Sequence, residues 1–128
     1  MSDQEQPVKH TSTYTVYFAE TDAGGVMYYA RYLDFCERSR IDWFLNNGLS
    51  QTNILEKHKG GFVVSAVEAK YIKPIQFESK IDVNISLKLM RNSKLILRHN
   101  LVCSESNELK ATIDITFAFI NYEKMFPD

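Results

Sequence analysis

The chain has 128 residues, 45% of them hydrophobic, and its 15 Lys and Arg against 16 Asp and Glu give a net charge of −1. This length suits one domain with its own core and argues against a second. Because no basic stripe is interleaved with aromatic residues, nucleic-acid binding is not expected. No apolar run is long enough to span a bilayer and the first residues carry no secretory signal, which favours a cytoplasmic protein without integral membrane contact.

Cysteine and histidine residues are few and dispersed. Cys36 and Cys103 form neither a disulfide framework nor a metal-binding spacing, so both are expected to be reduced core thiols. His10, His58 and His99 fall in a tail, a loop and a strand of the predicted pattern and do not cluster with either cysteine. We therefore expect no metal site.

The first elements are a leader and a strand. Residues 1–12 are polar and aperiodic, which predicts a flexible leader in front of a single domain over residues 13–128. The stretch TYTVYFA, residues 13–19, alternates and is rich in β-branched and aromatic residues, so it predicts a strand. Gly24 and Gly25 then break the pattern.

A long helix is predicted from residue 29 to residue 47, where apolar side chains recur at intervals of three, four or seven. Further apolar residues widen this face well beyond a stripe, so much of the helix should be surrounded by protein. Gly48 is expected to end the helix, because glycine adopts the left-handed conformation without a Cβ penalty.

The rest of the chain reads as a connection followed by four strands. LSQTNILEKHKGG is a polar connection with one short helical turn after Ser50, and it is long enough to cover a pocket. Strand-like segments separated by turn-forming residues follow at 62–72, 80–89, 95–103 and 111–120. In KIDVNISLKL apolar and polar residues alternate strictly, which predicts one buried and one wet sheet face. This order predicts an α+β fold in which a five-stranded antiparallel sheet wraps around one central helix.

The segment between the first strand and the helix, ETDAGGVMYY, carries a pattern suited to chemistry. Taken alone, Asp22 is an ordinary turn aspartate and the tyrosines are ordinary core residues. Taken together, paired glycines let the backbone approach a ligand, and the helix start presents unpaired N–H groups with partial positive charge. A carboxylate opposite those donors can attack a carbonyl or activate water, so acyl transfer is the leading reaction class.

The stretch VYFAETDAGGVMYYARYLDFCERSR resembles the signature of the hotdog-fold acyl-CoA thioesterases of the 4-hydroxybenzoyl-CoA thioesterase type, including the bacterial Tol-Pal-associated branch. The resemblance runs from about Tyr14 to Phe119, because the order of elements is also that of the hotdog fold. It implies an enzyme that hydrolyses a small aromatic or short-to-medium acyl-CoA to the free acid and CoA. It also implies no cofactor, since CoA is part of the substrate, and a homo-oligomer, a dimer or a dimer of dimers (a homotetramer), with active sites at subunit interfaces.

By position, the resemblance assigns roles to the loop residues. Asp22 matches the catalytic carboxylate, as nucleophile or general base, and the backbone amide of Tyr29 matches the group that polarises the thioester carbonyl. Gly24, Gly25 and Val26 are expected to line the approach of the substrate through their backbone.

This chain departs from the pattern at two positions. The Tol-Pal-associated branch usually has histidine at the position of Tyr29 and tyrosine at that of Phe18, whereas the hydroxybenzoyl branch can carry tyrosine at the former. A mechanism that needs an imidazole at residue 29 is therefore not expected. The ring of Tyr29, with Tyr32 as a second substrate-binding residue, is expected to favour a flat or short acyl group.

The phosphates of CoA need a local cation in a chain of balanced charge. The resemblance points to the turn MRNSK, so Arg91 and Lys94 are the candidates, with Lys73 and Arg98 as weaker ones. The alternative is that all four are ordinary solvated charges.

Two other functions are alternatives to thioester hydrolysis. A related hotdog hydratase or dehydratase would need a histidine beside a carboxylate, and no histidine falls in or near the motif. A non-catalytic acyl-CoA or acyl-carrier binding protein would have no need to retain Asp22.

Overall fold

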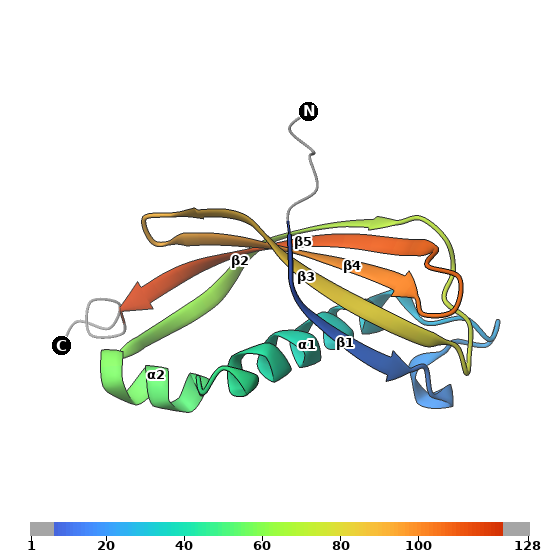
Figure 1. Cartoon of the computed structure of the whole chain (residues 1–128), viewed down its shortest axis with the longest axis horizontal. Coiled ribbons are helices and arrows are strands. Elements are labelled where there is room, and N and C mark those ends of the chain that lie inside the picture. The colour runs from blue at the N-terminus through green and yellow to red at the C-terminus, as the bar shows by residue number, and fades with distance from the viewer. Residues whose placement is uncertain (1–6, 122–128) are drawn as a thin grey trace.

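The computed structural model describes residues 7–121, apart from the side chains at positions 54, 55 and 58. Five strands form one antiparallel sheet in the order β1-β3-β4-β5-β2. The predicted α+β architecture, a five-stranded antiparallel sheet curved around one long helix, is confirmed (Figure 1). The elements are β1 (Val8–Thr15), η1 (Phe18–Glu20), η2 (Tyr29–Arg31), α1 (Tyr32–Asn46), α2 (Gln51–His58), β2 (Gly60–Tyr71), β3 (Lys80–Arg91), β4 (Lys94–Cys103) and β5 (Leu109–Asn121).

The core lies between α1 and one face of the sheet. The alternation predicted for residues 80–89 is confirmed, because Ile81, Val83 and Ile85 are fully buried on β3. Phe35 and Cys36 of α1 are also fully buried, and each large apolar side chain removed from water stabilises the fold by about 1.5–3 kcal/mol.

Helix α1 is less enclosed than its sequence predicts. It ends as expected, with Gly48 in the left-handed region at φ +74°. However, its buried residues are confined to one strip, and Leu33, Ile41 and Leu45 are 37%, 37% and 57% exposed. The prediction that protein surrounds much of the helix is therefore wrong for a single protomer, since one apolar flank stays open. The buried strip consists of Tyr32, Phe35, Cys36 and Ser39.

Strand β1 starts earlier than expected. It runs over Val8–Thr15 and pairs with β3, so residues 8–12 of the predicted leader belong to the sheet, and residues 1–6 lie outside the described residues. The polar composition of residues 8–12 does not indicate a strand, because this strand lies at an edge of the sheet. Its hydroxyls form hydrogen bonds to side chains of β3. For example, the Thr11 Oγ1 hydroxyl donates to Asn84 Oδ1 at 2.7 Å. Residues 18 and 19, the expected end of the strand predicted over residues 13–19, belong instead to the short helix η1.

The connection after α1 holds a helix of its own. The predicted single turn after Ser50 is extended to α2, Gln51–His58, so the prediction of a loop at His58 is wrong. Ser50 caps this helix by accepting from the Asn53 N–H at 3.4 Å, and Lys59 ends it at φ +53°. Within residues 7–121, no helix has both the length and the apolarity needed to cross a membrane.

Candidate active site

The loop that carries Asp22 is a closed turn. Thr21 and Met27 pair as an antiparallel bridge, and inside it the Asp22 N–H donates to Val26 O at 2.9 Å. Gly25 lies at φ +79°, a conformation that a residue with a Cβ rarely adopts. Glycine is therefore required at position 25 by the turn itself.

The Asp22 carboxylate is oriented through one of its oxygens. Oδ1 accepts from the Gly24 N–H at 2.8 Å, and a Cβ at position 24 would come within 3.3 Å of the same oxygen. The side chain is exposed, and Oδ2 has no hydrogen-bond partner among the residues that the structure describes. Asp22 thus makes the hydrogen bond of an ordinary turn aspartate through Oδ1. This bond fixes the orientation of the carboxylate and leaves Oδ2 available.

Neighbouring backbone fixes this loop to the body of the protein. The Met27 N–H donates to Ile75 O at 2.6 Å, and the Phe77 N–H donates to Gly25 O at 3.1 Å. These bonds tie one side of the turn to the segment between β2 and β3. The loop is therefore held against a second segment that is distant in sequence.

The helix start lies directly beside the base of the loop. The Tyr28 N–H donates to Glu20 O at 2.9 Å, so residue 28 is pinned to the segment that leads into Asp22. Tyr29 is the first residue of η2, and no side chain caps this end. The first N–H groups of a helix have no acceptor within it and carry partial positive charge. Backbone hydrogen bonds therefore join the loop that carries the Asp22 carboxylate to the helix start that carries the Tyr29 amide.

Glu20 has a role beside this loop that sequence reasoning missed. Its side chain is buried, and Oε1 accepts from the Tyr17 N–H at 2.7 Å. Arg38 of α1 approaches Oε2 at 3.9 Å. An acid placed to bond back to the residue three positions before it is the capping-box spacing, which could have indicated this anchor.

Aromatic rings gather at the start of the helix. The ring centroids of Tyr28 and Tyr29 are 4.7 Å apart, and Tyr71 of β2 lies 6.3 Å from Tyr29 and 4.9 Å from Tyr32. Tyr32 is buried, and that burial raises the pKa of its phenol. Tyr71 was not predicted, because nothing local in the sequence indicates which residue of a distant strand reaches the helix.

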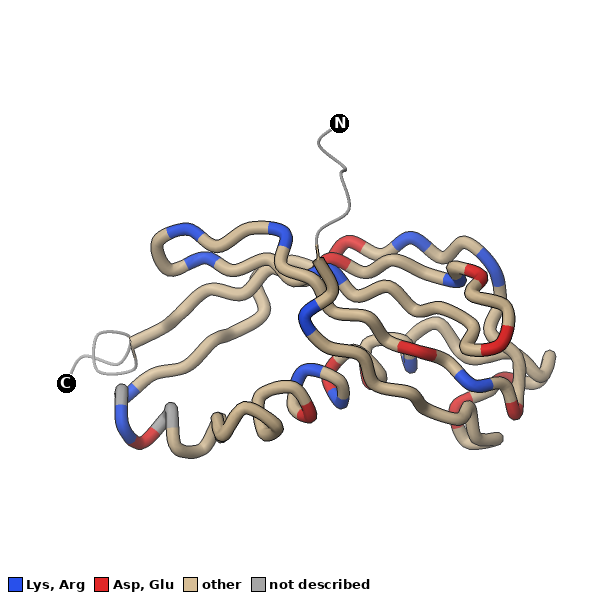
Figure 2. Tube along the Cα trace, in the orientation of Figure 1, with Lys and Arg blue, Asp and Glu red and all other residues tan. Residues whose placement is uncertain are grey.

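The two favoured cations lie at the other end of the protomer. Arg91 and Lys94 are exposed, directly opposite each other across the β3–β4 hairpin (Figure 2). Strand β3 starts near the loop, where the Glu78 N–H donates to Val16 O. The strand has 12 residues, and at a rise of about 3.3 Å per residue it spans roughly 36 Å. The structure therefore does not bring Arg91 or Lys94 to Asp22 within one protomer.

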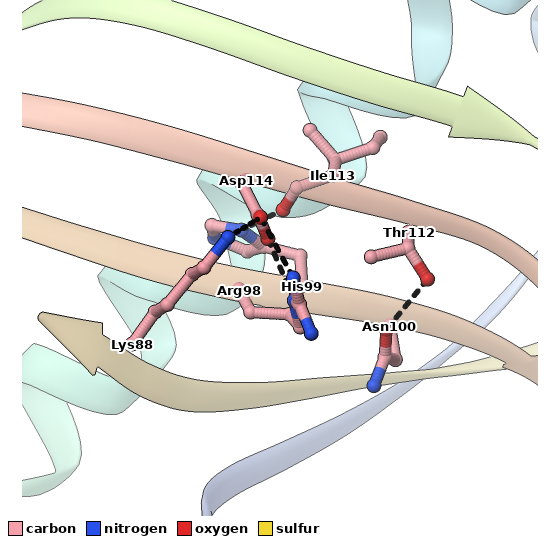
Figure 3. A network of polar contacts seen from close by, with 7 residues as sticks. All are labelled: Lys88, Arg98, His99, Asn100, Thr112, Ile113 and Asp114. Carbon is pink, nitrogen blue, oxygen red and sulfur yellow. Dashed lines mark hydrogen bonds and ion pairs between the residues drawn. The ribbon is translucent and has the colours of Figure 1, made fainter. Parts of the chain in front are cut away.

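The two weaker cation candidates are engaged by carboxylates. Arg98 donates through Nε and Nη2 to the two oxygens of Asp114, at 2.8 and 2.9 Å, and Lys88 Nζ donates to the same carboxylate at 2.8 Å (Figure 3). Burial raises the pKa of Asp114, but these hydrogen bonds outweigh it and hold the pKa below its usual value. Lys73 pairs with Glu108. Both interactions favour a structural role.

Cysteine and metal chemistry are not evident at the loop. Cys36 is a core thiol as expected, and burial raises its pKa to about 12. Cys103 is only partly buried, so its assignment to the core is wrong. Within the described ranges, no three His, Cys, Asp or Glu side chains gather to hold a metal ion.

A family model described as the thioesterase-like superfamily matches residues 16–127. The chain belongs to this family. The prediction of a thioester hydrolase is therefore confirmed. Among curated relatives, acyl-CoA thioesterase YbgC of Helicobacter pylori is 27% identical over 119 residues, covering 88% of this chain and 86% of the relative. YbgC of Haemophilus influenzae is 30% identical over 112 residues, covering 88% and 81%.

Solved structures agree with the family. A structure described as "Probable Thioesterase from Bartonella henselae" is 28% identical, with a TM-score of 0.80 over 89% of this chain and 93% of that one. Slr0204, a 1,4-dihydroxy-2-naphthoyl-CoA thioesterase from Synechocystis, has a TM-score of 0.81 at 21% identity, covering 88% and 82%, which shows the fold alone. The prediction of the hotdog fold is confirmed.

Proposed function

We propose that the chain hydrolyses acyl-CoA thioesters and that the loop from Thr21 to Met27, with the helix start after it, forms its active site. The observation that carries the proposal is the closed loop itself, which joins the directed Asp22 carboxylate to the uncapped helix end at Tyr29. The YbgC relatives, which are named as acyl-CoA thioesterases, support the class of substrate.

In this proposal the Tyr29 N–H donates to the thioester carbonyl oxygen and stabilises the negative charge that develops there. Asp22 Oδ2 then acts in one of two ways. It attacks the carbonyl carbon, the C–S bond breaks, CoA leaves as thiolate, and water hydrolyses the mixed anhydride to restore the carboxylate. Alternatively, it takes a proton from water as the water oxygen bonds to the carbonyl carbon, and the departing sulfur receives that proton. Both routes consume one water and release the acid and CoA.

We infer that the active site is completed by a second copy of the chain bound along β2. This strand is an edge of the sheet, and Phe62, Val64, Val67 and Tyr71 on it are 48%, 52%, 45% and 48% exposed. An apolar edge strand with unpaired backbone groups is a template for strand pairing, and a two-fold interface uses the same surface of both copies.

Such a dimer would bring the separated groups together. Lys94 lies opposite Ala118, which lies opposite Val63, so the cationic hairpin is at the start of β2. At the other end of β2, the Tyr71 hydroxyl reaches Tyr29 O at 3.5 Å. Antiparallel pairing of two β2 strands sets the start of one beside the end of the other. Arg91 and Lys94 of the second copy would then approach the loop of the first and could bind the CoA phosphates.

The tyrosine rings at the helix start support a small aromatic or short-to-medium acyl group, because they form an aromatic cluster of tilted and edge-on rings beside the Tyr29 amide. A hydratase is not favoured. His99 is fully buried on β4 and His10 bonds to Ser12 on β1, so no described histidine side chain lies beside Asp22.

The test is thiol release by the purified chain from a panel of aromatic, short-chain and long-chain acyl-CoA thioesters. We expect turnover of at least one aromatic or short-chain member and slower turnover of long-chain ones. If no member is hydrolysed but acyl-CoA still binds, the alternative of a non-catalytic binding protein replaces the proposal. Faster turnover of long chains would overturn the acyl-group assignment alone.

A further inference from the structure

Glu20 is a buried acid that the proposed reaction does not use. The residue is 9% exposed, whereas Ala19 before it and Asp22 after it are exposed. Burying a carboxylate away from water is unfavourable unless hydrogen bonds and an opposite charge compensate for it. A surface turn does not need a buried acid, so the contacts of Glu20 indicate what its burial achieves.

The side chain of Glu20 closes the turn that leads into the loop of Asp22. Its Oε1 accepts from the Tyr17 N–H at 2.7 Å, and its own N–H donates to Tyr17 O at 3.0 Å. The two residues are therefore bonded in both directions, in the manner of a capping box. Thr21 is fixed next, because its N–H and its hydroxyl both donate to Phe18 O, at 3.0 and 2.8 Å. The last residue before Asp22 thus has a defined position.

The main chain of Glu20 holds the other end of the same loop. Its carbonyl oxygen accepts from the Tyr28 N–H at 2.9 Å. Asp22 lies two residues after this carbonyl in the chain, and Tyr29 is the residue after Tyr28. Glu20 therefore joins the segment that carries the carboxylate to the segment that carries the amide. A rotation of the Glu20 peptide would move these two groups relative to each other.

Arg38 of α1 compensates the buried charge. Its Nη2 lies 3.9 Å from Glu20 Oε2, and its guanidinium lies over the ring of Phe35, 5.4 Å from the centroid. Phe35 is fully buried, so Arg38 is placed against the core of the protein. At 3.9 Å the contact with Glu20 is too long for a hydrogen bond and acts through charge. The two oxygens of Glu20 thus have separate partners, a backbone N–H that fixes its position and a cation that balances its charge.

We propose that Glu20 is a positioning residue, which sets the Asp22 carboxylate in register with the Tyr29 amide through its hydrogen bond to Tyr17. This inference rests on the proposed function. Glu20 does not act on the substrate itself, because it is buried and both of its oxygens face protein groups. Hydrolysis needs the carboxylate and the amide at one thioester carbonyl, and a displacement of about 1 Å can slow such a reaction about 100-fold.

The test compares Glu20→Gln with Glu20→Met, two substitutions of similar size. The glutamine side chain keeps an oxygen that can accept from the Tyr17 N–H, whereas that of methionine has none. We expect Glu20→Gln to keep kcat within about threefold of the parent. Glu20→Met should lower kcat at least about tenfold and leave KM within about twofold, because the loss is one of geometry in the transition state. Glu20→Ala takes the place of Glu20→Met if the latter does not fold.

Asp42→Leu is the matched control. It removes the carboxylate that accepts from the Tyr14 hydroxyl at 2.5 Å, a bond between β1 and α1, and should leave kcat unchanged. Steady-state thiol release measures kcat and KM at a temperature where thermal unfolding shows that every variant is folded. A Glu20→Gln variant as slow as Glu20→Met would reject the inference, since the bond to Tyr17 would then not be the cause.

A double substitution separates positioning from a general structural role. Glu20→Met is combined with Asp22→Asn, which removes the carboxylate that Glu20 is proposed to position. In this background Glu20→Met should lower kcat by about threefold or less, because the effects of residues that act as a unit are not additive. The same loss in both backgrounds, or parental kcat in Glu20→Met alone, would overturn the inference.

Amide hydrogen exchange, followed by NMR, distinguishes this inference from the proposed function. Glu20→Met should speed the exchange of the Tyr28 and Asp22 amides at least about tenfold. The Val83 amide of β3 should be unchanged, and Glu20→Gln should exchange like the parent. If the parent hydrolyses no thioester, the proposed function fails, and faster exchange in Glu20→Met still shows that Glu20 fixes the loop. Parental exchange in Glu20→Met would contradict that role even in an active enzyme.

Discussion

Asp22 shows how one side chain combines a turn bond with a candidate chemical role. Its Oδ1 is used by the Gly24 N–H, which leaves Oδ2 directed outward. Asparagine can keep the same local bond through its carbonyl oxygen but offers neither a nucleophile nor a base. Replacing Asp22 by asparagine therefore removes the proposed chemical role of the side chain and keeps its structural role.

We expect Asp22→Asn to lower kcat for acyl-CoA hydrolysis by about 10²–10⁴-fold while the thermal midpoint stays near the parental value. Steady-state thiol release and thermal unfolding measure the two quantities. Asp34→Asn, the same change in the first turn of α1, serves as the control and should leave kcat unchanged. Parental turnover in Asp22→Asn would remove this residue from the mechanism.

Gly25 and Gly48 form a matched pair for testing the loop. They lie at φ +79° and +74°, and a Cβ at either would meet nothing within 4 Å, so alanine acts through backbone strain alone. Each substitution should reduce the free energy of unfolding by about 1–2 kcal/mol. Only Gly25→Ala should also reduce kcat/KM, because only that glycine shapes the Asp22 turn. Urea unfolding shows whether both variants are folded under the assay conditions. If the folded Gly25→Ala and Gly48→Ala variants lose kcat/KM equally, the loop assignment is contradicted.

His99 makes stability depend on pH. Its pKa is about 4 in the folded chain against 6.5 for an ordinary histidine, because burial and Arg40 disfavour the charged form despite the opposing effect of Asp114. The unfolded chain therefore binds the proton more readily between these values. The stabilisation is complete above pH 6.5 and is lost as the pH falls towards 4, a change of about 3 kcal/mol.

Urea unfolding of the parent and of His99→Gln between pH 4 and pH 7 measures this dependence. The difference between the two pH profiles should rise from acid to neutral pH and level off above about 6.5. Parallel profiles would show that His99 does not titrate in this way.

At the scale of elements, the β3–β4 hairpin carries a cation pair with no carboxylate partner in the described part of the chain. Arg91 and Lys94 are cross-strand neighbours, so their side chains can meet one phosphate from two sides. The contrast with Arg98, which is bound to Asp114, shows that charge alone does not identify an anion site.

Replacing Arg91 and Lys94 together by alanine should raise KM for CoA esters about tenfold or more with little change in kcat. A truncated thioester without the nucleotide is the matched control, and its KM should be nearly unchanged. Equal losses on both substrates would exclude these residues from the nucleotide site.

At the scale of the whole molecule, the open apolar flank of α1 and the apolar edge of β2 indicate an incomplete surface. Val67 in the middle of β2 is 45% exposed, whereas the other edge strand, β1, is covered with threonine and serine hydroxyls. The difference between the two edges favours association along β2 only.

A lysine at Val67 should therefore weaken self-association and activity together. We expect Val67→Lys to shift the chain towards monomer in analytical ultracentrifugation and to reduce kcat/KM in parallel. Val8→Lys, the same change on the 54% exposed Val8 of β1, is the control and should alter neither. A monomeric Val67→Lys variant with full activity would contradict a shared active site.

The sequence by itself determined the α+β order of elements, the alternation of β3, the glycine at the end of α1 and the loop with Asp22 beside a helix start. These features depend on neighbours in the chain, through side-chain periodicity and backbone conformation. Only the tertiary structure decided the strand order, the burial of Glu20, the approach of Tyr71 to Tyr29, and the separation of Arg91 and Lys94 from Asp22. It alone also showed the contact between Arg40 and the buried His99. Such contacts join residues far apart in sequence, and they follow from how the sheet packs on the helix, which no local pattern encodes.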